Sequence, residues 1–139
     1  MVREQYECLK SGKDLRQNLI ALKQELKEEE AREELLRILA GDYSILTGLL
    51  SDSDPKVRKN AAIVLGRLKQ RENVLPLYEA YHRETQLFVK SDYLKALVEL
   101  DYSEYKDSLN KDLEKLEQYQ PKEEEEKHIR EELTALRRL

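Results

Sequence analysis

The chain has 139 residues, a net charge of −4 at pH 7 and 39% charged residues, a composition that suits one domain with a core and much exposed surface. One Phe, no Trp, four Gly and three Pro provide too few strand and turn formers for an all-β fold, so an all-α protein is expected. The single cysteine, Cys8, excludes an intramolecular disulfide, and the longest apolar run is only AAIVL (61–65). We therefore expect a cytoplasmic protein with no signal peptide and no membrane contact.

Helix signals follow one another along the chain. Asp14 with Gln17 predicts a capping box at one helix start, and Gly12 and Gly41 are suited to left-handed turns after helices. Pro55 suits the first position of another helix, after the N-cap candidates of SDSD (51–54). Apolar residues spaced by three and four define the helices between these signals. We expect helices near 2–10, 14–28, 30–40, 43–50, 55–69, 73–83, 86–100, 102–119 and 122–138.

An internal repeat of 32 residues links two of these helix pairs. It relates the apolar positions Val57/Val89, Ala62/Leu94, Leu65/Leu97 and Leu68/Leu100. The shorter helices before them are aligned by the same shift, which pairs Ile45 with Leu77, Leu46 with Tyr78 and Leu49 with Tyr81. Two helix–turn–helix units of equal length indicate a repeat protein, in which each pair is stabilised by its neighbours.

The stretch DPKVRKNAAIVLG (54–66), preceded by an apolar helix and a short turn, resembles the HEAT repeat. That resemblance implies a single domain, 1–139, built as a right-handed α-solenoid of antiparallel helix pairs. Its parts would be a degenerate repeat 1–40, repeats 43–69 and 73–101, and a closing pair 102–139. Asp54 and Arg58 match the family's structural brace, whereas the next repeat keeps Lys90 but has Gln86 and Leu87 in place of Asp and Pro. The family implies a non-catalytic scaffold whose partner is a protein.

A looser resemblance connects the chain with the N-terminal helical module of bacterial RNA methylases. It rests on the order of LRQNLIALKQELK, the stretch from LLRILAGDYS to VLGRL, and LFVKSDYLKAL. It implies an RNA-positioning domain of a larger SAM-dependent methyltransferase, whose catalytic domain would follow in a longer chain.

The candidate binding face is a basic run in an otherwise acidic chain. No acid interrupts residues 56–71, and second helices line the ligand-binding side of HEAT-like stacks. The run could contact structured RNA or a protein, or it could be an ordinary solvated helix face. The candidate residues are Lys56, Lys59, Arg67, Lys69 and Arg71.

No catalytic, cofactor or metal site is expected from the sequence. His82 and His128 have no ligand partner at helical spacing, and the glycines form no phosphate-binding loop. We therefore expect no enzyme activity, no cofactor and no small-molecule substrate.

Overall fold

The computed structural model describes residues 1–100, which form helices and no strand. This confirms the all-α expectation for that part of the chain. The helices expected near 102–119 and 122–138 lie outside the described residues. The described elements are α1 (Val2–Lys10), α2 (Leu15–Glu25), α3 (Glu29–Leu39), α4 (Ser44–Gly48), the 3-10 helix η1 (Leu49–Ser51), α5 (Pro55–Leu68), the 3-10 helix η2 (Arg71–Asn73), α6 (Val74–Arg83) and α7 (Leu87–Leu100).

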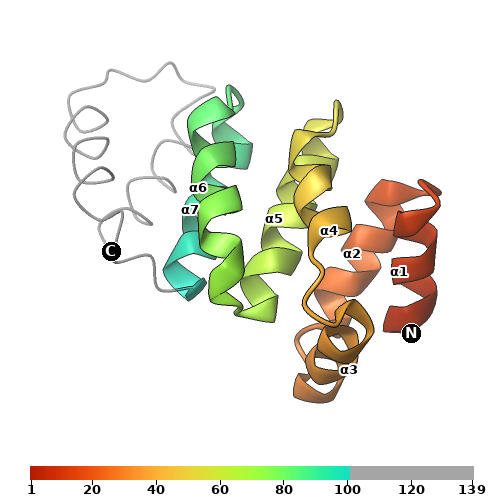
Figure 1. Cartoon of the computed structure of the whole chain (residues 1–139). Coiled ribbons are helices and arrows are strands. Elements are labelled where there is room, and N and C mark those ends of the chain that lie inside the picture. Colours follow the sequence, from red (N-terminus) through yellow and green to blue (C-terminus); the bar gives the residue numbers. More distant parts are fainter. Residues whose placement is uncertain (101–139) are drawn as a thin grey trace.

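The helices pair in chain order and form two rows. α1 packs on α2, α4 with η1 packs on α5, and α6 packs on α7. The second members of the pairs also pack on one another, α2 on α5 and α5 on α7. Figure 1 shows the three pairs succeeding one another from the N-terminus to α7. We call α1, α4–η1 and α6 the first row, and α2, α5 and α7 the second row.

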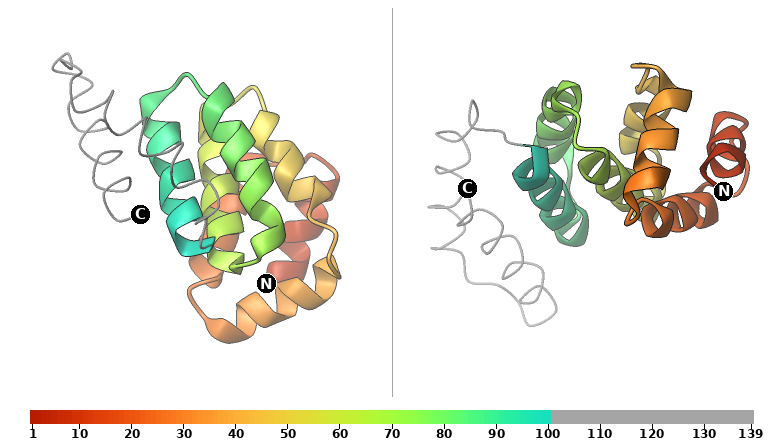
Figure 2. Two further views of the ribbon diagram at one scale, coloured as in Figure 1. Left: turned by 60° about the vertical axis from the view of Figure 1, so that its left-hand side comes forward. Right: turned by 90° about the horizontal axis from the view of Figure 1, so that it is seen from below.

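Helix α3 belongs to neither row. It contacts α1 and α5, and it crosses one end of the pairs at a steep angle (Figure 2). A break at Leu26–Glu28 separates it from α2, so the region around 28–31 contains two helices rather than one long one. At its C-terminal end, Ala40 and Gly41 both take left-handed backbone, with φ of 49° and 82°, and reverse the chain toward α4.

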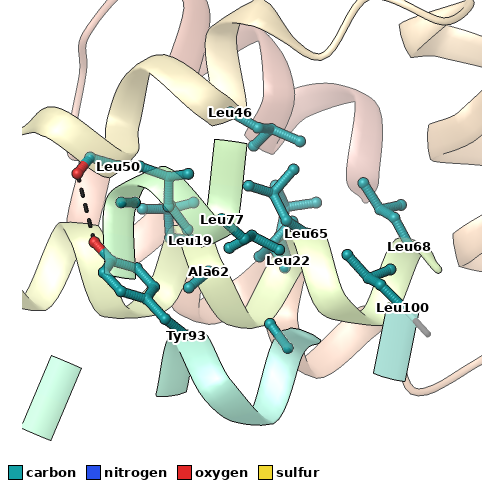
Figure 3. Packing of buried hydrophobic residues seen from close by; sticks show 14 of the residues in the cluster. Leu19, Leu22, Leu46, Leu50, Ala62, Leu65, Leu68, Leu77, Tyr93 and Leu100 are labelled. Carbon is teal, nitrogen blue, oxygen red and sulfur yellow. Dashed lines mark hydrogen bonds between the residues drawn. The ribbon is translucent and has the colours of Figure 1, made fainter. Parts of the chain in front are cut away.

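The core runs continuously between the rows. Its large, fully buried side chains come from every pair, as with Leu19 and Leu22 of α2, Leu46 of α4 and Leu65 of α5 (Figure 3). Each pair thus buries apolar surface against the next pair, which is how helical arrays gain stability.

The 32-residue repeat is confirmed for the second row. All four positions in α5 and all four equivalents in α7 are buried, with at most 4% exposed surface. In the first row the same shift is wrong by one residue. Leu46 and Leu50 correspond in burial to Leu77 and Tyr81, a shift of 31. The link before α7 therefore contains one residue more than the link before α5.

Gly66 lets α5 and α7 approach closely, as its position in the sequence predicts. A Cβ atom built on Gly66 would lie 3.0 Å from both Cα and Cβ of Ala96, closer than packed carbon atoms approach. The missing side chain therefore sets the spacing between these two second-row helices.

The two predicted helix starts behave differently. Asp54 is a true N-cap, because its side chain accepts from the Lys56 amide at 2.9 Å and Pro55 opens the helix. The capping box at Asp14 is wrong. Asp14 has left-handed backbone, with φ 48° and ψ 49°, and makes no side-chain cap, whereas capping needs an extended N-cap residue. The Asn18 side chain binds the Asp14 carbonyl there instead, at 3.0 Å.

None of the helices within residues 1–100 is both long and apolar enough to cross a membrane.

Candidate binding face

One side of the second row is left uncovered by the first row, and it carries most of the candidate residues. Positions on this side recur at steps of three and four along each helix, and all of them are exposed or half-buried. We call this surface the α2–α5–α7 face. It consists of Arg16, Ile20, Lys23 and Lys27 from α2 and its C-terminal turn, Lys56, Lys59, Ile63 and Arg67 from α5, and Asp92, Lys95 and Glu99 from α7.

Lys23 lies where α2 meets α5. Its Nζ donates to Oδ1 of Asn60 at 3.1 Å, and the Asn60 side chain, which is buried, donates in turn to the Lys56 carbonyl at 2.9 Å. The guanidinium of Arg67 donates to the Lys23 backbone carbonyl. Partial burial lowers the pKa of Lys23, and the neighbouring charges of Lys59 and Arg67 lower it further. The centre of the face is thus a site of concentrated positive charge.

Two hollows indent this face. The larger, of about 430 Å³, is lined by Leu26, Lys27, Glu29, Arg32, Arg67, Lys69 and Glu99. The smaller, of about 150 Å³, lies between α5 and α7 and is lined by Ile63, Arg67, Asp92, Lys95, Ala96 and Glu99. Arg67 and Glu99 line both hollows, so a cation and an anion stand at their shared border.

The structure brings some of the predicted basic residues together and separates others. Lys56, Lys59 and Arg67 share the face. Lys69 follows the end of α5 with left-handed backbone (φ 56°) and lines the larger hollow. Arg71 lies in η2, which leads into the first row, and lines neither hollow.

The sequence prediction missed half of the face. Lys23 and Lys27 of the N-terminal part, and Asp92 and Glu99 of α7, were not among the predicted residues. The signal was present as a stripe at Arg16, Ile20, Lys23 and Lys27, which repeats the spacing of the α5 stripe. Recognising it required knowing that α2 packs beside α5.

Asp54 and Arg58 both link neighbouring pairs, but not through each other. Arg16 of α2 donates to Oδ2 of Asp54 at 2.7 Å, while Arg58 of α5 holds both carboxylate oxygens of Glu84, at 2.8 and 2.9 Å. Each contact joins an arginine near the start of one second-row helix to a carboxylate just before the next. Direct pairing of Arg58 with Asp54, one of the ways to read the sequence, is therefore wrong.

The Arg58–Glu84 pair is the more buried of the two links. The Glu84 side chain is only 3% exposed and that of Arg58 17%. Arg58 also donates to the Asp52 carbonyl at 2.8 Å, and Glu84 accepts from the Gln86 amide at 3.1 Å. Burial alone would raise the pKa of Glu84, but the bonds from Arg58 and Gln86 outweigh it and hold the pKa below its ordinary value.

Tyr93 completes this cluster from within the core. Its fully buried hydroxyl lies 3.4 Å from the Leu50 carbonyl and 3.3 Å from Glu84 (Figure 3). Burial, followed by the charge of Glu84, raises the pKa of Tyr93 far above its ordinary value. This tyrosine is part of the fold and is not available for a partner.

Within residues 1–100, no group of three or more His, Cys, Asp or Glu side chains could hold a metal ion. Comparison with protein-family models, curated proteins and solved structures finds no match to this chain.

Proposed function

We propose that the chain is a non-catalytic helical-repeat scaffold, a right-handed α-solenoid of the HEAT type, that binds a protein partner through the α2–α5–α7 face. The observation that carries this proposal is the sharing of one uncovered side by three adjacent helices. First-row side chains pack on the opposite side of these helices, so the uncovered side is the surface available to a ligand.

The composition of the face supports a protein partner. Ile20 is 40% exposed and Ile63 lines a hollow, so apolar surface lies among the charges. Protein interfaces commonly combine an apolar centre with a charged rim. A nucleic-acid site would favour uniformly positive charge, whereas Asp92 and Glu99 stand on the same face.

Comparative affinity purification from the cells of origin tests the proposal. The tagged wild-type chain is compared with Lys27→Glu/Lys59→Glu, which reverses charge on the face, and with Arg3→Glu/Arg37→Glu, which makes the same change of net charge on exposed positions of α1 and α3. We expect a discrete set of proteins to be lost with the first variant and retained with the second. Equal recovery with both variants would contradict the proposal.

A second candidate function is an RNA-positioning domain of a larger methyltransferase. It is favoured by the continuous positive surface that Lys23 and Lys27 add to Lys56, Lys59 and Arg67. Salt-titrated binding to tRNA tests it. Affinity that falls steeply with salt and is lost in Lys56→Glu/Lys59→Glu/Arg67→Glu supports RNA binding, and absence of binding at low salt rules it out.

A further inference from the structure

We propose that the partner segment is an acidic peptide with one aliphatic side chain, whose carboxylates meet the lysines of α2 and α5 and whose apolar side chain enters the hollow at Ile63. This inference rests on the proposed function and adds the chemistry of the partner.

The first argument is the distribution of charge across the face. Cations dominate the α2 and α5 parts of the face, in contrast to the chain as a whole, which has a net charge of −4. The cations lie on two helices that pack together, so a single extended or helical segment can contact both rows of lysines. Carboxylates placed along such a segment would give electrostatic complementarity, which mainly supplies specificity and a fast association rate.

The second argument is the state of Lys23. It is half-buried beside Lys59 and Arg67, and its Nζ has the neutral amide of Asn60 as a hydrogen-bond partner. Because these surroundings disfavour its charged form, an added carboxylate would relieve an existing electrostatic cost. A partner with negative charge at this point therefore gains more than it would at an isolated surface lysine.

The third argument is the hollow between α5 and α7. At about 150 Å³ it is below the size of pockets that enclose small-molecule ligands, which start at about 300 Å³. Its floor includes Ile63 and Ala96, and Gly66 holds the two helices close just beneath it. These dimensions and this lining suit one aliphatic side chain.

The acids of α7 decide between a peptide and a nucleic-acid backbone. Asp92 and Glu99 line the same hollow as Arg67 and Lys95, so a ligand that crosses α7 meets both signs of charge. A peptide can place a neutral or basic residue there, whereas a phosphate backbone carries negative charge at every step. The face therefore fits an acidic peptide better than RNA.

Selection of short random peptides displayed on phage, against the full wild-type chain, tests this inference. We expect enrichment of peptides rich in Asp and Glu around one Leu, Ile or Val. The Kd of a selected peptide should rise about tenfold in Lys27→Glu/Lys59→Glu and stay within about twofold in Arg3→Glu/Arg37→Glu. Ile63→Ser should weaken binding of the same peptide while leaving its salt dependence unchanged, since it removes only the apolar contact.

The outcomes separate the two proposals. Selected peptides that are neutral or basic, and bind in competition at this face, would overturn the acidic inference while the scaffold function stands. No enrichment of any peptide, together with salt-dependent binding of tRNA at the same lysines, would overturn both. If Lys27→Glu/Lys59→Glu loses its helical circular dichroism, Lys27→Gln/Lys59→Gln provides the same test, with a smaller loss of affinity expected.

Discussion

At the scale of single residues, the link between α6 and α7 depends on one carboxylate. Glu84 accepts from the Arg58 guanidinium through both oxygens and from the amides of Thr85 and Gln86. It thereby ties the α5 pair to the α7 pair and organises the start of α7. It lies 32 residues after Asp52, whose carboxylate accepts from the Asp54 amide at 2.9 Å, so the repeat preserves this turn with a different carboxylate.

Arg58→Ala should lower the free energy of unfolding by about 3–5 kcal/mol, because it leaves the buried Glu84 carboxylate without its counter-charge. Arg16→Ala is the matched control. It breaks the equivalent contact to Asp54, whose partners are 49% and 31% exposed, and should cost no more than about 1 kcal/mol. Urea unfolding of both variants checks this, and equal costs would contradict the assignment of Arg58 as the buried brace.

Glu84 also predicts a dependence of stability on pH. Because its pKa is lower in the folded chain than the ordinary value of 4.5, the ionised form stabilises the fold fully above that value, and the stabilisation is lost as pH falls through the folded pKa. The difference in unfolding free energy between wild type and Glu84→Gln should therefore be largest near neutral pH and shrink below about pH 4.5. A difference that is unchanged between neutral and strongly acidic pH would show that the carboxylate charge is not what matters.

Gly66 gives a test whose sign can be reversed. Gly66→Ala should destabilise the chain by about 1–3 kcal/mol, since its Cβ would meet Ala96 at 3.0 Å. Gly48→Ala, in α4 with no atom within 4 Å of the added Cβ, should instead stabilise by up to about 1 kcal/mol through helix propensity. Thermal unfolding distinguishes them, and stabilisation by both substitutions would mean that α5 and α7 are not closely packed at Gly66.

At the scale of elements, the sequence predicted the second row better than the first. The apolar positions of α5 and α7 are spaced for burial on two sides, so their 32-residue shift survives in the structure. The first-row helices are short and partly 3-10, as in η1, so a shift of one residue costs little and the alignment by sequence failed there. The start of α2 was mispredicted because the left-handed Asp14 follows from the tight turn after α1, which a local capping pattern does not reveal.

Leu65 is the element-scale test of the core. It is fully buried in α5, the helix that packs on both neighbouring pairs. Leu65→Ala should cost about 2–5 kcal/mol through the cavity that it leaves, whereas Leu75→Ala, at a position 50% exposed in α6, should stay within about 0.5 kcal/mol. A cost below about 1 kcal/mol at Leu65 would contradict its place in the core.

At the scale of the whole molecule, the binding face is a product of the packing. Lys56, Lys59 and Arg67 could be predicted from one helix, because helical spacing alone places them together. Their companions Lys23 and Asp92 come from other helices, 36 residues before and 33 after Lys59 in the numbering, and only the packing of the second row assembles them. The positive charge that the sequence presents as a local run is therefore one part of a mixed surface.

The central claim is that the second row binds a protein on its uncovered side. The most direct measurement places a photo-crosslinking amino acid at Ile20, on the α2–α5–α7 face, or at Leu75, in the first row, which are 40% and 50% exposed. Irradiation in the cells of origin, followed by mass spectrometry, should give a discrete protein adduct from position 20 and none in common from position 75. The same adducts from both positions, or adducts with RNA alone from position 20, would contradict the account.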